Sequence, residues 1–127
     1  GNFVNAFKEW EPLAKKGHSN AQYNLGLMYH NGQGIIKDYT LSGKWLLLAS
    51  EQGNINAMRL LSTFYASGKG IPLDLNRAYL WAKIAADNED ENSLAIVKVL
   101  EKEMSSSEIK DAQNLVAICK SKKLIDC

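Results

Sequence analysis

The stretch GHSNAQYNLGLMYHNGQGIIKD, residues 17–38, decides the fold, because a related stretch, GNINAMRLLSTFYASGKGIPLD, follows 36 positions later at residues 53–74. The two stretches align without a gap. The identical pairs are Gly17/Gly53, Asn20/Asn56, Ala21/Ala57, Leu25/Leu61, Tyr29/Tyr65, Gly32/Gly68, Gly34/Gly70, Ile35/Ile71 and Asp38/Asp74. Self-similarity at a fixed period of roughly 20–50 residues is the signature of stacked repeat architectures. The sequence therefore predicts a repeat solenoid.

Each copy is predicted to form two helices. In the first helix, apolar residues recur at the spacing of an amphipathic helix face: Ala21, Leu25, Met28 and Tyr29, and then Ala57, Leu61, Phe64 and Tyr65. The second helices are expected over residues 39–52 and 75–88, with buried faces of Leu41, Trp45, Leu48 and Ala49, and of Ala78, Trp81, Ala82 and Ala85. Glycine loops at residues 32–35 and 68–71 separate the two helices. The predicted core residues are Leu25, Tyr29, Leu61, Tyr65, Trp45 and Trp81.

The flanking sequence extends the pattern to seven helices in one domain, residues 1–127. The expected parts are an N-terminal half-repeat (3–17), two full repeats (18–52 and 53–88), a degenerate capping repeat (89–104) and a C-terminal capping helix with its tail (105–127). Pro12 is expected to kink or shorten the first helix. Ser105 and Glu108 match the S-x-x-E capping box at the start of the last helix. The predicted fold class is all-α, an α-α superhelix of 36-residue helix-turn-helix repeats.

Composition limits the class of function. The chain has 127 residues, of which 46% are hydrophobic, and a formal net charge of +1. This size and composition indicate a single globular domain, and the small net charge gives no indication of a nucleic-acid partner. No apolar run approaches the roughly 20 residues that a transmembrane helix needs, so no membrane insertion is expected.

No pattern of catalytic or metal-binding residues emerges. His18 and His30 lie at opposite ends of one predicted helix, without an acid or nucleophile at catalytic spacing. The Gly-x-Gly loops follow no strand and lack the lysine of a phosphate-binding loop. The acidic residues between positions 87 and 91 lack the spacing of a calcium loop, and they are expected to precede a helix, whose N-terminal dipole favours carboxylates. We therefore expect no cofactor, no metal and no enzymatic activity.

These residues resemble the Sel-one-like repeat family, a subclass of tetratricopeptide-like helical solenoids. The family pattern A-x-x-x-L-G-x-x-Y-x-x-G-x-G-[VI]-x-x-D is matched at every specified position over residues 21–38. The second copy departs from it only at Ser62, where the family prefers glycine, and Trp45 and Trp81 occupy the place of the family's aromatic residue. The resemblance covers about residues 3–104. It implies a solenoid whose first helices line a concave face.

Cys119 and Cys127 allow two interpretations. Their spacing does not fit a zinc site, and it leaves open two reduced thiols or a disulfide that ties the chain end to the last helix. The resemblance favours the disulfide, because small exported bacterial members open with a segment like residues 6–14, AFKEWEPLA, and often carry two cysteines spaced in this way. It implies a periplasmic or secreted protein whose signal peptide has been removed; the alternative is a cytoplasmic location. The last helix resembles the capping helix of many members, which implies a true C-terminal end.

Binding residues are expected on the first helix of each copy, at positions that are not used for packing in the core. This stripe mixes amides, an aromatic ring and a few cations, which suits the backbone and side chains of an extended peptide. The candidates are Asn20, Tyr23, Leu27, His30, Asn31, Asn56, Arg59, Thr63, Ser67, Asn92, Ala95, Val99 and Lys102. Tyr23, Asn56 and Arg59 are the strongest of these.

The sequence thus predicts a non-catalytic interaction module, expected to be monomeric, that binds a protein or peptide along its concave face. One alternative is recognition of a cell-envelope component such as a peptidoglycan fragment, a role that some exported family members suggest. An enzyme is the least favoured class.

Overall fold

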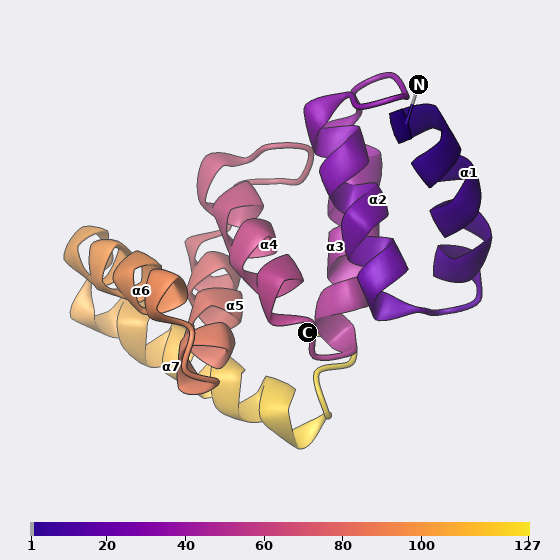
Figure 1. Cartoon of the computed structure of the whole chain (residues 1–127). Coiled ribbons are helices and arrows are strands. Elements are labelled where there is room, and N and C mark those ends of the chain that lie inside the picture. The colour runs from indigo at the N-terminus through magenta and orange to yellow at the C-terminus, as the bar shows by residue number, and fades with distance from the viewer. Residues whose placement is uncertain (1) are drawn as a thin grey trace.

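The protein is a curved row of α-helices, described by a computed structural model for residues 2–127 (Figure 1). The helices are α1 (Asn2–Lys15), α2 (Ser19–Asn31), α3 (Tyr39–Glu51), α4 (Ile55–Ser67), α5 (Leu75–Asp87), α6 (Glu91–Glu103) and α7 (Ser106–Ser121). Residues 2–127 contain no β-strand, and none of their helices is long and apolar enough to cross a bilayer. The predicted all-α solenoid of seven helices is confirmed.

Neighbouring helices pack against one another along the row. The pairs α2/α3 and α4/α5 are the two copies of the repeat; α1 packs on α2, α3 packs on α4, and both α6 and α7 pack on α5. Figure 1 shows the tail after α7 returning to the end of α3. Pro12 does not shorten α1, which continues to Lys15. Shortening, one of the two expected effects, is therefore absent, because one proline close to the helix end removes only one backbone hydrogen bond; the other expected effect, a kink, stays a prediction.

The repeated glycines and aspartates end and start the helices. Gly32 and Gly68 follow α2 and α4 with φ of 67° and 68°, the left-handed conformation that glycine adopts without steric cost. Asp38 and Asp74 then cap α3 and α5, each accepting a hydrogen bond of 3.0 Å from a backbone N–H three residues later. The identical pairs of the sequence therefore fix the same helix boundaries in both copies.

The second glycine of each loop allows one repeat to approach the helix before it. A Cβ atom on Gly34 would lie 2.7 Å from the backbone at Phe3 and Val4 in α1. A Cβ atom on Gly70 would overlap the backbone carbonyl of Tyr39 at the start of α3. Residues 3 and 39 are themselves one period apart, so the same contact joins each copy to the helix that precedes it.

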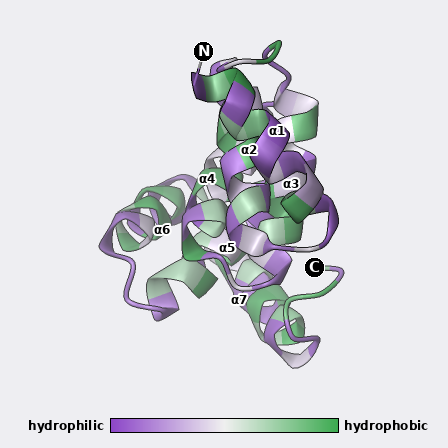
Figure 2. Ribbon diagram, turned by 45° about the vertical axis from the view of Figure 1, so that its right-hand side comes forward, coloured by the Kyte–Doolittle hydropathy of each residue, from purple (hydrophilic) through white to green (hydrophobic). Residues whose placement is uncertain are grey.

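The core is formed by the faces that the helices turn toward one another. Leu25, Leu61 and Trp81 are fully buried, as predicted. Tyr29, Tyr65 and Trp45 are only half-buried, and the hydroxyl groups of the two tyrosines can keep their contact with water. Burial raises the pKa of the Tyr65 hydroxyl above its ordinary value. Figure 2 shows hydrophobic and hydrophilic residues alternating around the helices, as expected for amphipathic elements.

The buried face of α3 differs from the predicted one. Leu46 and Ala49 are fully buried together with Ser42, whereas Leu48 is 44% exposed. The prediction was wrong for Leu48 because α3 is packed by both α2 and α4, and the residues that allow this close packing are small. The apolar pattern alone therefore assigned the wrong face.

The last helix is fastened to α5 by an ion-pair triad as well as by apolar packing. Asp87 of α5 accepts from the ammonium group of Lys120 of α7 at 2.8 Å, and Lys83 lies 3.2 Å from its other oxygen. Burial alone would raise the pKa of Asp87, but the hydrogen bonds from Lys120 and Lys83 outweigh it and lower that pKa. The predicted capping box of Ser105 and Glu108 is present at the start of α7.

Ser62 is the one departure from the family pattern. It takes part in a hydrogen bond between the two helices of its copy, and the donor of that bond lies on the opposite helix from the donor in the first copy. In the first copy, the hydroxyl of Ser42 in α3 donates to the carbonyl of Gly26 in α2 at 2.6 Å. In the second copy, Ser62 occupies the place of Gly26 and Ala78 that of Ser42, and Ser62 donates to the carbonyl of Ala78 at 2.7 Å. The hydroxyl has moved to the other helix, and the bond between the helices is kept.

The volume around Ser62 is also adjusted. A Cβ atom on Gly26 would lie 2.8 Å from the side chain of Leu46, so a side chain at position 26 would have to displace Leu46. The position equivalent to Leu46 in the second copy is the smaller Ala82, which is compatible with a serine at position 62.

Ser62→Ala is expected to lower the free energy of unfolding by about 1 kcal/mol, the usual net contribution of one hydrogen bond. In Ser62→Ala/Ala78→Ser the hydroxyl takes the position that it has in the first copy, so most of the loss should be recovered. Urea unfolding measures both changes. Ser67→Ala is the control, because this exposed hydroxyl bonds only within α4; its effect should stay below about 0.5 kcal/mol. Equal losses in the single and double variants would contradict the exchange.

Glu89 takes the place of a repeated glycine. Gly17 and Gly53 have φ of 98° and 91°, and Glu89, one further period along the chain, has φ of 69°. A side chain in this left-handed region costs roughly 1–2 kcal/mol. The degenerate third copy therefore keeps the left-handed backbone turn of the other copies, although glutamate replaces the glycine that favours this turn.

Glu89→Gly is expected to raise the free energy of unfolding by about 0.5–1 kcal/mol, because glycine adopts this conformation without strain. Gly53→Ala is the reverse test: a Cβ atom there meets nothing within 4 Å, so a loss of similar size would report backbone conformation alone. Thermal unfolding followed by circular dichroism measures both variants. A lower melting temperature for Glu89→Gly would refute this interpretation.

Candidate partner-binding groove

An open groove lies across α2, α4 and α6, the first helices of the successive copies. Its volume is about 290 Å³, close to the lower end of the range of small-molecule pockets, roughly 300–1,000 Å³. It is lined by Tyr23, Leu27, Asn56, Arg59, Leu60, Thr63 and Ile96. The floor is apolar, and polar side chains of α4 form part of its rim.

Helical spacing brings the lining residues together. Tyr23 and Leu27 lie four residues apart on α2, and Asn56, Leu60 and Thr63 lie three or four apart on α4, so each set occupies one helix face. The opposite faces of α2 and α4 are buried against α3 and α5. The groove is therefore the face that packing within each copy leaves uncovered.

Arg59 is held in place at the rim of the groove. Its guanidinium donates to the side-chain oxygen of Asn56 at 2.6 and 3.1 Å. Its Nε lies 3.6 Å from Asp90, which caps α6 by accepting from the backbone N–H of Ser93 at 3.0 Å. Arg59 thus links α4 to the start of α6. With 26% of its side chain exposed and five N–H donors in the guanidinium, it can still donate to a ligand.

A second hollow adjoins the first through Ile96. It has a volume of about 360 Å³ and is lined by Ala66, Ala95, Ile96, Val99, Leu100 and Glu103. Val99 is largely exposed. The two hollows form an apolar path from α2 to the far end of α6. Among residues 2–127, no group of three or more His, Cys, Asp or Glu side chains is placed to hold a metal ion.

The structure gathers some of the predicted residues into these hollows and leaves others outside. The groove contains Tyr23, Leu27, Asn56, Arg59 and Thr63, and the second hollow contains Ala95 and Val99. Their role in binding stays a prediction. The candidates that line neither hollow are Asn20, His30, Asn31, Ser67, Asn92 and Lys102.

Several of the candidates outside the hollows have local hydrogen-bond partners. Asn20 accepts from the side chain of Asn54 at 3.2 Å, which joins α2 to α4. His30 and Asn31 bond to each other at 2.9 Å. Ser67 donates to the carbonyl of Thr63 within its own helix at 2.8 Å. The sequence prediction placed all of them on the concave stripe because helical periodicity does not reveal such contacts.

Leu60 and Ile96 line the groove but were missed. A signal for them existed in the sequence, because the equivalent position in the first copy is the polar Asn24. An apolar residue that replaces a polar one at a position outside the repeated core marks a surface that differs between copies.

The family can be assigned from the sequence pattern together with this fold. The sequence model of the Sel1 (Sel-one) repeat matches residues 19–54 and 55–90, more than half of the chain. The chain belongs to the Sel1 repeat family. The resemblance inferred from the repeated residues is therefore confirmed.

Two solved structures share this Sel1 repeat fold. The protective antigen c5321, present in uropathogenic Escherichia coli strains and displaying an SLR fold, has a TM-score of 0.87 and 28% identity over 89% of this chain. A Sel1 repeat protein from Oxalobacter formigenes has a TM-score of 0.71 and 31% identity over 72% of this chain. The chain spans only 24% and 26% of the lengths of these proteins. No curated protein matches the chain in sequence.

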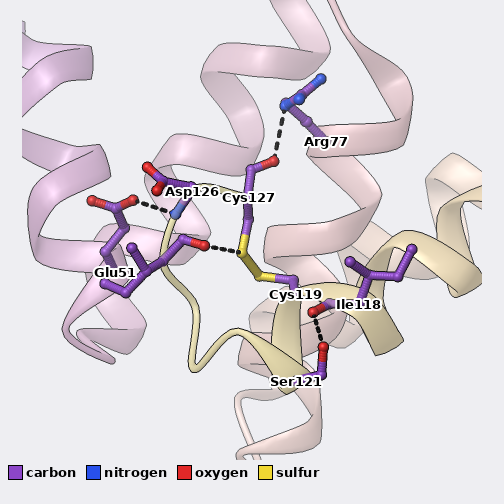
Figure 3. The surroundings of a disulfide bond; sticks show 8 residues. Glu51, Arg77, Ile118, Cys119, Ser121, Asp126 and Cys127 are labelled. Carbon is purple, nitrogen blue, oxygen red and sulfur yellow. Dashed lines mark hydrogen bonds between the residues drawn. A yellow bond between two sulfur atoms is a disulfide. The ribbon is translucent and has the colours of Figure 1, made fainter.

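The C-terminal tail of this Sel1 repeat chain is tied to α7 and contacts both copies of the repeat (Figure 3). Cys119 and Cys127 form a disulfide, the pairing that the family resemblance implied. The backbone N–H of Asp126 donates to the Glu51 carboxylate of α3 at 3.1 Å, and the Cys127 carbonyl accepts from Nε of Arg77 of α5 at 3.2 Å. The tail therefore joins the second helices of the two copies.

Removal of the disulfide by Cys119→Ser/Cys127→Ser is expected to lower the free energy of unfolding by about 2.5 kcal/mol. Without the closed loop, the unfolded chain has more conformational entropy and is favoured. Thermal unfolding with and without reductant measures this. Reductant should lower the melting temperature of the wild-type protein and leave that of the double variant unchanged. Titration of unreduced, denatured protein should find no thiols; two thiols would rule out the disulfide.

Proposed function

We propose that this chain binds a protein or peptide segment along the groove between α2, α4 and α6. Sel1 repeat proteins are generally protein–protein interaction modules, and stacked helical repeats present extended concave surfaces. The observation that carries the proposal is the apolar floor of Tyr23, Leu27, Leu60 and Ile96 beside the polar rim formed by Arg59 and its neighbours.

The size and chemistry of the groove suit a peptide. A volume of about 290 Å³ is at the lower limit for a small-molecule pocket, and it can receive one or two apolar side chains of a partner. The amide of Asn56 and the guanidinium of Arg59 can hydrogen-bond to the partner's backbone carbonyls. The second hollow extends the apolar path beyond Ile96. An extended segment with apolar anchors therefore matches the surface.

Sel1 repeat proteins are typically non-catalytic scaffolds, and we propose the same role for this chain. We also propose that it works in an oxidising compartment, such as the periplasm or the cell exterior. The support is the Cys119–Cys127 disulfide, because disulfides persist in oxidising compartments and are rare in the cytosol.

The proposal is tested by placing a photo-crosslinking amino acid at Thr63, in the groove, or at Lys44, exposed on α3. After irradiation in the native cells, the partner should be captured from position 63 and not from position 44. The captured protein is then purified and its affinity measured by calorimetry. Capture of peptidoglycan fragments from position 63, without any protein, would favour the envelope-ligand alternative.

Thr63→Arg should weaken binding of the captured partner at least about tenfold, the loss expected when a central contact is disrupted. Thr63 is exposed, so the arginine fills the groove without disturbing the core. Asn114→Arg is the control, because Asn114 is an exposed polar residue of α7, away from the groove, and the charge change is the same. If both variants bind as tightly as the wild type, the partner does not use this groove.

A further inference from the structure

Two lysine ammonium groups and a histidine ring lie around the ring of Tyr39, the first residue of α3. The ammonium group of Lys69 lies 4.8 Å from the ring centroid, and that of Lys37 lies 5.6 Å from it. The ring of His30 lies 5.6 Å from the same ring. The buried ring of Phe64 packs against both aromatic rings, with its centroid 6.2 Å from that of Tyr39 and 5.7 Å from that of His30.

The repeat scaffold does not require this cluster. Each of its polar members is replaced one period away by a residue of different chemistry: His30 by Ala66, Lys37 by Leu73, Lys69 by Gln33 and Tyr39 by Leu75. At each of these positions, the other copy of the repeat therefore has the same fold without the charged side chain or the tyrosine. Residues that the scaffold dispenses with are the ones expected to serve recognition.

The positive charges of the cluster have no acidic partner in the part of the chain that the structure describes. The ion pairs found there involve neither Lys37 nor Lys69. Asp38, next to Lys37, is engaged as the cap of α3, with its Oδ1 accepting from the backbone N–H of Leu41 at 3.0 Å. Attraction to the ring of Tyr39 offsets part of the repulsion between the two ammonium groups. A carboxylate is the group that such unpaired ammonium groups bind most strongly.

We propose that Lys37, Lys69 and Tyr39 form a binding site for acidic side chains of a protein segment. The lysines supply charge-assisted hydrogen bonds, and each ammonium group also lies within reach of the tyrosine ring. This site is separate from the groove and does not depend on what the groove binds. His30 lies three residues beyond Leu27 on α2, so the cluster is about one helical turn from the groove.

The test uses a rhodamine-labelled hexaglutamate peptide, titrated with the full chain at low salt and followed by fluorescence anisotropy. Lys37→Leu/Lys69→Gln takes its residues from the other copy of the repeat, so the fold should tolerate it. We expect it to weaken binding at least about tenfold, the effect of losing two charge-assisted contacts. Tyr39→Leu, also taken from the other copy, should weaken binding several-fold while both lysines remain.

The matched control is Lys98→Leu/Lys110→Gln, which removes the same charge from two exposed lysines of α6 and α7. It should change the affinity less than about twofold, the size of a rim-charge effect. Thermal unfolding of every variant checks that the fold is kept. The proposal is overturned if the control weakens binding as much as the cluster variant, or if the wild type does not bind hexaglutamate. Binding of a phosphoserine hexapeptide without hexaglutamate binding would overturn it in favour of a phosphate site.

Discussion

The close approach of each Gly-x-Gly loop to the helix before it is the constraint on which the rest of the structure depends. At Gly34 and Gly70 the backbone of one repeat lies against the backbone at the start of α1 or α3, and no side chain fits between them. This contact sets how far each helix pair stands from the preceding one. Two glycines without side chains therefore help to set the spacing of α2 and α4. The width of the groove between these helices depends on that spacing.

The regularity of the repeat made the fold predictable from the sequence. Helix ends depend on local residues, and the glycines and aspartates that end and cap the helices occur in both copies. The buried face of α3 was less predictable, because its closest contacts are made by Ser42 and Gly43, which an apolar pattern does not count. Ser62 shows the same limit. Its meaning depends on Ala78 and Ala82, which lie on another helix and are recognised as its partners only when the two copies are compared.

The candidate site was partly predictable for a related reason. Helical periodicity identified the stripe that contains Tyr23, Leu27 and Arg59, and these side chains do meet in one groove. Periodicity could not show that Asn20 is occupied by Asn54, because that contact crosses between copies. It also could not show that Ile96 of α6 lies beside the residues of α2 and α4, because that contact depends on how the copies stack. Which residues lie at the outer limits of the site could therefore be determined only from the three-dimensional structure.

The tail has a mechanical consequence for the solenoid. Stacked repeats contact only their neighbours, so a solenoid bends and straightens by small changes at each junction. Here the backbone near Cys127 is bonded to Glu51 of one copy and to Arg77 of the next, while the disulfide anchors it to α7. Any tilt of the two copies at this edge must break those bonds or carry α7 along. The tail therefore opposes a change in the angle between the two copies, and with it a change in the shape of the surface that a partner would meet.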